Sequence, residues 1–281
     1  SHIHTNLLGG IGLGAFHVEV LLQGGSRDQG HAVDIVDDLG VDVGLAAEHV
    51  ETGAHGSAGD LGAHSLVALQ ALLMSAGLKR GDIDGVIMSS VVPGINFTLE
   101  HMLAHYLDKT PMLVGPGIRT GLNIKLDNPR ELGGDIICDC VSAFRRYGGP
   151  CIVLDFGTAT TISAVSGQGE FLGGAICPGV KLALDALAGK AAKLPNIELE
   201  LPQRAIGRNT VASMQSGLLY GYVGQVEYLI SRFKQEMAQP DIKVIATGGM
   251  SRVIGSATKA IDTADSLLTL EGLRLIYEMN S

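Results

Sequence analysis

The order of apolar segments after residue 148 constrains the fold more than any other feature of this 281-residue sequence. Gly148-Gly149-Pro150 ends a helical stretch, because neither paired glycines nor proline continue a helix easily. Apolar periodicity then predicts strands over 151–154, 160–166 and 170–177, helices over 180–193 and 210–237, a strand over 244–246 and a helix over 269–279. Three successive strands followed by helices and a further strand predict an α/β lobe with a buried sheet.

The stretch before the Gly-Gly-Pro break has a similar character from about Ser65 onward. Its pattern predicts helices over 65–78, 96–107 and 134–147 and strands over 86–88 and 112–114. A chain of this length can bury two cores of common domain size. We therefore expect two lobes, one over 65–148 and the other over 149–281.

The first 64 residues differ in composition from the rest of the chain. They contain no Lys, Pro, Tyr, Met or Cys, and they hold most of the histidines without regular spacing. The segment is a divergent first subdomain, a tag remnant at its tip, or the product of a wrong start or a frame error. We favour the last interpretation for most of it and expect 1–64 to be atypical, although Phe16 to Leu22 alternates as a strand does.

Composition narrows the function classes. The formal net charge of −9 disfavours a nucleic-acid partner, because an acidic surface repels a phosphate backbone. The longest uncharged run, 209–226, is too polar to span a membrane, and no basic region precedes Leu7 and Leu8, so we expect a cytoplasmic protein without a signal peptide. The cysteines lack zinc spacing and are expected to be reduced, small apolar residues: Cys138, Cys140, Cys151 and Cys177.

Two short strings carry candidate chemistry. Asp155-Phe156-Gly157-Thr158-Ala159-Thr160-Thr161 follows a buried strand, where a carboxylate can hold a cation beside phosphates and Gly157 allows close backbone approach. The same residue types also make ordinary tight turns, so the string by itself leaves both interpretations open. Ala246-Thr247-Gly248-Gly249 follows another buried strand; its glycines would let adenine lie on the backbone, although alone it favours a simple strand-to-helix turn.

Seven motifs between Val86 and Asn280 give the sequence a family resemblance. In chain order they are Ser89-Ser90-Val91-Val92-Pro93, Gly115 to Leu122, Asp127-Asn128-Pro129 with Gly133-Gly134-Asp135, Asp155 to Thr161, Phe171 to Ile176 with Pro178-Gly179, Gly207-Arg208-Asn209-Thr210, and Ala246 to Gly249. Together they resemble the type III pantothenate kinases, also called the Bvg accessory factor family. That resemblance implies two RNase H-like lobes of the actin-like ATPase superfamily, the first incomplete or atypical at its N-terminus.

The resemblance also implies roles for matching residues. Asp135 takes the position of the catalytic carboxylate that accepts or orients the hydroxyl proton of pantothenate. The implied substrate-binding residues are Gly133, Gly134, Asp135, Ile136 and Thr210, the implied ATP-binding residues are Gly157, Thr158, Gly248 and Gly249, and Asp155 is the implied ligand of a monovalent cation, K⁺ or NH₄⁺. The family further implies Mg²⁺-ATP, a homodimer and formation of 4'-phosphopantothenate, the first step of coenzyme A biosynthesis. Judged alone, Asp135 would be a helix N-terminal acid stabilised by the helix dipole.

The sequence departs from the family pattern at three places. Ile136 stands where the family has arginine, and Leu126 stands where it commonly has tyrosine. The family's first Asp-x-Gly-Asn-Thr phosphate loop is missing; the nearest string, Asp42-Val43-Gly44, continues as Leu45-Ala46. We therefore hypothesise that residues 1–64 are not the family's first subdomain.

Three functions remain in competition at the level of the sequence. The leading one is an active pantothenate kinase. A catalytically impaired relative acting as a binding or accessory protein is favoured by Ile136 and the missing loop. Another actin-like sugar or acid kinase is disfavoured by the residue cluster from Asp127 to Asp135.

Overall fold

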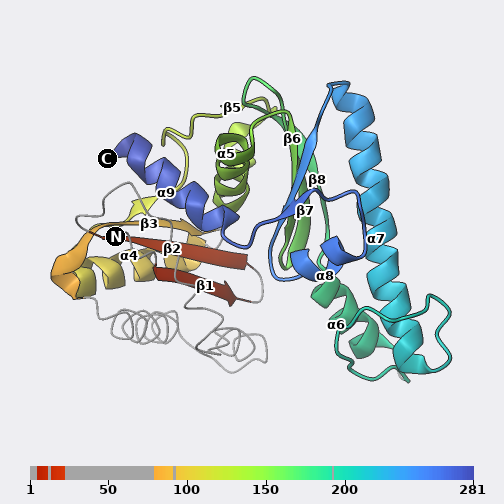
Figure 1. The fold of residues 1–281 in the computed structure, drawn as a ribbon. Coiled ribbons are helices and arrows are strands. Elements are labelled where there is room, and N and C mark those ends of the chain that lie inside the picture. The colour runs from red at the N-terminus through yellow and green to blue at the C-terminus, as the bar shows by residue number, and fades with distance from the viewer. Residues whose placement is uncertain (1–4, 12–13, 23–78, 91–92, 192) are drawn as a thin grey trace. The chain divides into compact units, whose positions relative to one another are not determined.

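The computed structural model describes residues 5–11, 14–22, 79–90, 93–191 and 193–281 (Figure 1). The chain forms two compact units. Unit 1 comprises Ser1–Thr120, Leu132–Cys138 and Leu270–Ser281, and unit 2 comprises Gly121–Glu131 and Asp139–Thr269. The helix predicted over 65–78 lies outside the described residues. The division into domains at residue 148 stays a prediction.

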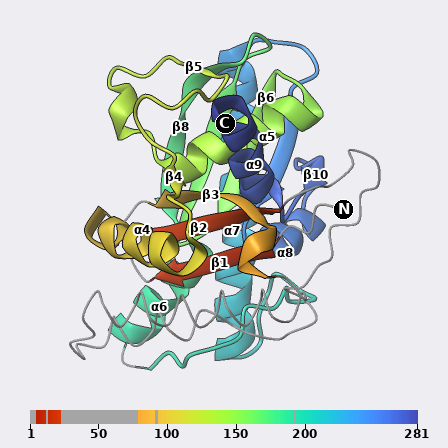
Figure 2. The same ribbon diagram turned by 90° about the vertical axis from the view of Figure 1, so that its left-hand side faces the viewer.

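Unit 1 contains a four-stranded sheet in the order β1-β2-β3-β4. The strands are β1 (Thr5–Ile11), β2 (Gly14–Leu22), β3 (Ile83–Ser90) and β4 (Met112–Leu113). β2 is antiparallel to both β1 and β3, whereas β3 and β4 are parallel and are connected through α4 (Pro93–Leu107). Figure 2 shows this sheet with α4 beside it. A strand therefore forms where the alternation from Phe16 to Leu22 indicated one.

β1 and β2 are neighbouring antiparallel strands, and Ile11 of β1 pairs with Gly14 of β2. The sequences of these two strands contain no Asp-x-Gly-Asn-Thr string.

The core of unit 1 is built from β3 and α4. β3 buries Val86, Ile87 and Met88 in succession, so both faces of the strand are covered and the sequence shows an apolar run instead of alternation. Leu99 and Leu103, four residues apart on α4, are buried as well. This is why a short apolar string sufficed to predict the strand and helical spacing sufficed to predict the helix.

Unit 2 contains a six-stranded sheet in the order β10-β9-β6-β7-β8-β5. The strands are β5 (Asn123–Ile124), β6 (Cys151–Phe156), β7 (Ala159–Val165), β8 (Glu170–Pro178), β9 (Lys243–Thr247) and β10 (Thr263–Ala264). β6, β7 and β8 form an antiparallel meander, and β9 and β10 add in parallel on the other side of β6. This is the strand order of an RNase H-like lobe, and the predicted α/β class is confirmed.

The core of unit 2 lies between this sheet and α7 (Thr210–Met237). The helix buries Leu219, Tyr222, Val223, Val226 and Ile230, which recur at helical spacing on one face. Two further helices, α6 (Val180–Lys190) and α8 (Ser251–Ser256), supply Val180 and Ile254 to the same core. The sheet that carries the candidate motifs is thus packed against helices from three parts of unit 2.

The remaining helices are α5 (Gly134–Tyr147) and α9 (Leu268–Asn280). A Cβ atom added at Gly272 of α9 would overlap the backbone of Cys138, so these two helices touch within unit 1 at a glycine. Short 3₁₀ turns occur at Arg80–Asp82 and Pro129–Glu131. Over the part of the chain that the structure describes, no helix has both the length and the apolar character needed to cross a bilayer.

Candidate functional site

Asp155 lies at the carboxyl end of β6, directly before a tight hairpin. β6 ends at Phe156 and β7 begins at Ala159, and the Gly157 N–H donates to the Ala159 carbonyl at 3.1 Å. The turn consists of Gly157 and Thr158, both exposed. We call Gly157–Thr158 the hairpin turn. The hairpin expected from the sequence is confirmed.

Asp155 shares one sheet face with two threonines. Its Cα pairs with Thr161 on β7 and with Thr247 on β9, and paired residues project from the same face of a sheet. One carboxylate and two hydroxyl groups therefore belong to a single face at one end of the sheet. Oxygen ligands of this kind suit hard cations.

Gly248 brings the second glycine motif against the first. Its φ is +85°, and an added Cβ would lie 2.5 Å from Asp155 Oδ1 and 2.7 Å from the Phe156 backbone N. A residue with a side chain would therefore suffer both backbone strain and collision. Gly249 is exposed and has open space around it. Two strings about ninety residues apart in the sequence thus meet at one end of the sheet.

The segment after β8 closes against the hairpin turn. The Gly179 N–H donates to the Thr158 carbonyl at 2.9 Å. A Cβ at Gly179 would overlap the carbonyl oxygens of Gly157 and Thr158, so only glycine permits this approach. Pro178-Gly179 therefore packs directly against the hairpin turn.

This end of the sheet combines a glycine-containing turn with a carboxylate, groups that bind anions and hard cations respectively. A glycine-containing turn lets backbone N–H groups approach an anion, and Asp155 supplies one carboxylate. Within the described ranges, no group of three or more His, Cys, Asp or Glu side chains gathers to hold a metal.

Asp135 occupies the first turn of α5 in unit 1. Its Oδ1 accepts from the Ile136 N–H at 2.8 Å, and Ile137 N donates to the Gly133 carbonyl at 3.1 Å. The carboxylate thus satisfies a backbone donor that a helix start leaves open and lies at the positive end of the helix dipole. Ile136 is half-buried and has no group that could pair with an anion.

Gly134 joins the start of α5 to the end of β3. A Cβ added there would lie 2.6 Å from Ser89 Oγ and 3.2 Å from the Val114 carbonyl oxygen. Ser89 is 1% exposed, and its Oγ has no hydrogen-bond partner among the described residues. Nothing in the sequence indicated that these two motifs, Ser89 to Pro93 and Gly133-Gly134-Asp135, lie against each other.

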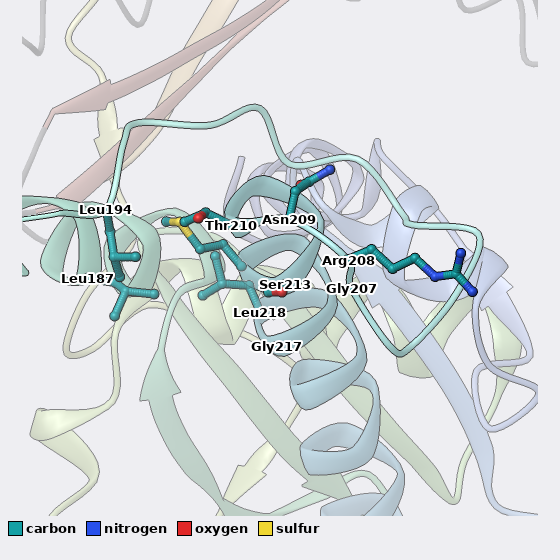
Figure 3. Close-up of a pocket in the computed structure, with 10 residues that line it drawn as sticks. Leu187, Leu194, Gly207, Arg208, Asn209, Thr210, Ser213, Gly217 and Leu218 are labelled. Carbon is teal, nitrogen blue, oxygen red and sulfur yellow. The ribbon is translucent and has the colours of Figure 1, made fainter.

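Thr210 begins α7 beside an open cavity of about 730 Å³ (Figure 3). Asn209 caps the helix, its Oδ1 accepting from the Ala212 N–H at 2.8 Å. The cavity is lined by Leu187, Leu194, Gly207, Arg208, Asn209, Thr210, Ser213, Met214, Gly217 and Leu218. Figure 3 shows the Arg208 side chain extending away from Leu187 and Leu194. The cavity combines an apolar end with a hydroxyl-bearing helix start.

The predicted site residues divide between the two units. Asp155, Gly157, Thr158, Gly248 and Gly249 come together at one end of the unit 2 sheet, and Thr210 also belongs to unit 2. Gly133, Gly134, Asp135 and Ile136 form the start of α5 in unit 1.

Sequence reasoning missed one contact at the Gly115 to Leu122 motif. Asn280, near the chain end, accepts from the Arg119 N–H at 2.9 Å and donates to the Arg119 carbonyl at 2.8 Å. This two-way bond ties the glycine-rich loop to the end of α9. No local pattern could indicate it, because the partners are 161 residues apart.

Comparison with known proteins gives a family match and several distant structures. The family model of the type III pantothenate kinases matches residues 43–232. A Baf family transcriptional activator from Campylobacter jejuni is 21% identical, with a TM-score of 0.47 over 64% of this chain and 79% of that one.

Two other solved structures are also similar over most of their length. The activator of 2-hydroxyisocaproyl-CoA dehydratase from Clostridium difficile is 11% identical, with a TM-score of 0.39 over 99% of this chain and 97% of that one. An inorganic polyphosphate/ATP-glucomannokinase from Arthrobacter sp. strain KM is 11% identical, with a TM-score of 0.42 over all of both chains. With every TM-score below 0.5, these likenesses support no conclusion about the site.

Proposed function

Since this chain belongs to the type III pantothenate kinase family, we propose that it transfers the γ-phosphoryl group of ATP to the primary hydroxyl of pantothenate. The products are 4'-phosphopantothenate and ADP, and the reaction is the first step of coenzyme A biosynthesis. The observation that carries the proposal is the meeting of Asp155, the hairpin turn and Gly248 at one end of the unit 2 sheet.

In this proposal the nucleotide lies at that end of the sheet. The Thr158 backbone N–H binds its phosphates beside Gly157, which allows the close approach while its own N–H stays bonded to the Ala159 carbonyl, and Gly248 and Gly249 border the adenosine, to which glycine presents no side chain of its own. Asp155 holds a monovalent cation, K⁺ or NH₄⁺, beside the phosphates. Mg²⁺, when bound to ATP, offsets the negative charge that the transferring phosphoryl group carries.

Asp135 is the catalytic residue of the proposal. Its carboxylate orients the pantothenate hydroxyl and accepts the proton as the oxygen bonds to phosphorus and the bond to ADP breaks. Phosphoryl transfer depends mainly on positioning and electrostatics, so one carboxylate that orients the hydroxyl and accepts its proton is sufficient. Gly133, Gly134 and Ile136 bind pantothenate beside it in unit 1, with Ile136 contributing packing only, and Thr210 is the pantothenate-binding residue proposed in unit 2.

We extend the proposal to the setting of the enzyme. It acts in the cytoplasm as a homodimer, with pantothenate and ATP as its partners and with neither nucleic acid nor membrane. The family supports the dimer, and the net charge of −9 supports the exclusion of nucleic acid.

A coupled ADP-release assay with pantothenate, ATP, Mg²⁺ and K⁺ tests the reaction. We expect pantothenate-dependent turnover that falls by at least about a hundredfold in Asp135→Asn, the usual effect of removing a catalytic base. Asp84→Asn is the matched control, because Asp84 is an exposed carboxylate of β3 in the same unit. Turnover that survives Asp135→Asn would overturn the assignment of the base.

A second candidate is a catalytically impaired relative that serves as a binding or accessory protein. It is favoured by Ile136, because the family's arginine would supply a fixed fork of donors to an anionic substrate. ADP binding without pantothenate turnover would support this candidate. Turnover gained by Ile136→Arg would identify the missing guanidinium as the cause, and turnover with another hydroxylated substrate would indicate a different kinase of the superfamily.

A further inference from the structure

Tyr222, a buried residue of α7, contacts the Pro178-Gly179 segment that packs against the hairpin turn. Tyr222 is 8% exposed and packs in the unit 2 core, and its hydroxyl donates to the Pro178 carbonyl oxygen. Pro178 is the last residue of β8 and pairs with Ala159, the first residue of β7. The tyrosine thus joins the longest helix of the described chain to the strand ends beside the turn.

The peptide group between Pro178 and Gly179 links Tyr222 to Thr158 by two hydrogen bonds. The Pro178 carbonyl that accepts from Tyr222 belongs to the same peptide unit as the Gly179 N–H, which donates to the Thr158 carbonyl at 2.9 Å. In a trans peptide the carbonyl and the N–H point in opposite directions. Tyr222 and Thr158 therefore bind opposite edges of one planar peptide group, and each hydrogen bond strengthens the other by polarising that group.

The geometry leaves this peptide little freedom. Gly179 lies so close to the hairpin turn that a Cβ would overlap the carbonyl oxygens of both Gly157 and Thr158. The Gly157 N–H is itself bound to the Ala159 carbonyl at 3.1 Å. A rotation of the Pro178–Gly179 peptide would therefore turn the Thr158 carbonyl and shift the turn with it.

We propose that Tyr222 is a positioning residue for nucleotide binding: its hydroxyl fixes the Pro178–Gly179 peptide, which in turn fixes Gly157 and Thr158. The inference rests on the proposed function insofar as the hairpin turn holds nucleotide phosphates. Tyr222 does not touch the nucleotide. It sets the direction of the backbone groups that do.

The hydroxyl of Tyr222 is a donor under all ordinary conditions. Burial raises the pKa of Tyr222 above its usual value of 10.0, and nearby Cys177 raises the pKa further. Losing the proton would place an anion against the Pro178 carbonyl oxygen, which is a repulsive contact. The neutral, donating form is therefore the one that the core stabilises.

Tyr220 offers a matched control on the same helix. Its hydroxyl donates to the Pro202 carbonyl at 2.7 Å, a bond of the same kind within the same unit. Because the two tyrosines are two residues apart, they project from different sides of α7. Tyr220 therefore reaches the segment between α6 and α7 and leaves the Pro178–Gly179 peptide untouched.

Isothermal titration of the full chain with Mg²⁺-ADP tests the inference. We expect Tyr222→Phe to weaken ADP binding by about fivefold, the scale of one lost hydrogen bond, and Tyr220→Phe to leave the ADP Kd within about twofold of wild type. Thermal unfolding of both variants shows how far each bond also supports the fold. In turnover assays, Tyr222→Phe raises KM for ATP and leaves KM for pantothenate unchanged.

The outcomes separate this inference from the proposed function. If the wild type binds ADP without pantothenate turnover, the proposed reaction fails, yet the ADP Kd of Tyr222→Phe still decides the role of Tyr222. An unchanged Kd with a lower melting temperature overturns the inference and leaves Tyr222 a purely structural residue. Equal weakening in Tyr220→Phe also overturns it, as does a wild-type protein that does not bind ADP.

Discussion

The backbone of Gly248 lies against the carboxylate of Asp155, so that a Cβ at position 248 would sit 2.5 Å from Asp155 Oδ1. The contact exists because β6 and β9 are adjacent and parallel, which brings their carboxyl ends to the same edge of the sheet. Asp155 and Gly248 thus belong to one site although either string alone reads as an ordinary turn.

Replacement of Gly248 by alanine should therefore damage both stability and nucleotide binding. Its positive φ costs a residue with a side chain about 1 kcal/mol or more, and the methyl group also meets Asp155 and Phe156. We expect a lower melting temperature and at least about tenfold weaker ADP binding by titration calorimetry. Gly249→Ala is the control for stability, because no atom of the described residues lies within 4 Å of an added Cβ there. Equal melting temperatures for the two variants would contradict the geometry.

Asn209→Ala should destabilise the start of α7. The substitution removes the 2.8 Å bond from the Ala212 N–H, and losing an N-cap of this kind costs about 1 kcal/mol. Urea denaturation should show a lower midpoint with an unchanged slope. Asn209→Ser, which keeps a capping oxygen, should recover most of the loss. A serine variant as unstable as the alanine variant would rule out capping as the cause.

Thr269→Val should cost more than a similar change on the surface. Thr269 Oγ1 lies 2.6 Å from Asp139 Oδ1, and both residues are buried, so the carboxylate would lose a hydrogen-bond donor in a dry environment. We expect a loss of about 1.5–3 kcal/mol in the free energy of unfolding, measured by urea denaturation. Thr258→Val, which removes an exposed 2.6 Å bond to Glu227, should cost under about 1 kcal/mol. The reverse order would contradict the prediction.

Stability should fall above pH 10 because of two tyrosines. The pKa of Tyr147 is raised above 10.0, first by burial and then by Asp265, and the pKa of Tyr222 is raised by burial and Cys177. The unfolded chain then loses these protons before the folded protein does. The stabilisation is complete below pH 10 and declines as pH rises through the folded pKa, by up to about 1.4 kcal/mol per pH unit for each group.

Tyr222→Phe isolates one of these contributions. Its urea midpoint should decline less steeply between about pH 10 and pH 11 than that of the wild type, while the difference between them stays constant below about pH 9. Parallel curves across the whole range would show that Tyr222 does not titrate differently in the folded and unfolded states.

Thiol labelling should distinguish Cys177 from the other cysteines. Burial raises the pKa of the Cys151 thiol from 9.0 to about 12, outweighing the opposite effect of Lys243, so almost no thiolate forms at neutral pH. Cys138 and Cys140 are fully buried, whereas Cys177 is partly exposed. Iodoacetamide followed by peptide mass mapping should find Cys177 modified first and Cys151 only after unfolding. Early modification of Cys151 would contradict its burial.

Local chemistry made most of the helices and strands predictable. Helical spacing located α7, and β6 and β9 were apparent because strands covered on both faces become continuous apolar runs. Predicted ends differ where no residue marks them: α6 ends at Lys190 instead of residue 193, and α4 begins at Pro93 instead of residue 96.

The shortest elements could not be predicted, because they contain too few residues to show a pattern. β5 and β10 have two residues each and α8 has six, too few for a period to emerge. The two strands form because a neighbouring strand offers backbone groups to pair with, as β8 does for Asn123 and Ile124 and β9 does for Thr263 and Ala264. Their stability comes from the sheet edge and not from their own sequence.

By itself, the sequence determined which residues could do chemistry: the acid after a buried strand, the glycines that permit close approach, and the acid at the start of α5. Only the tertiary structure decided which of them meet. The contacts of Gly248 with Asp155, of Tyr222 with Pro178, and of Arg119 with Asn280 join residues 44 to 161 positions apart. Such contacts depend on strand order and helix packing, which the whole chain sets together, so no local pattern records them.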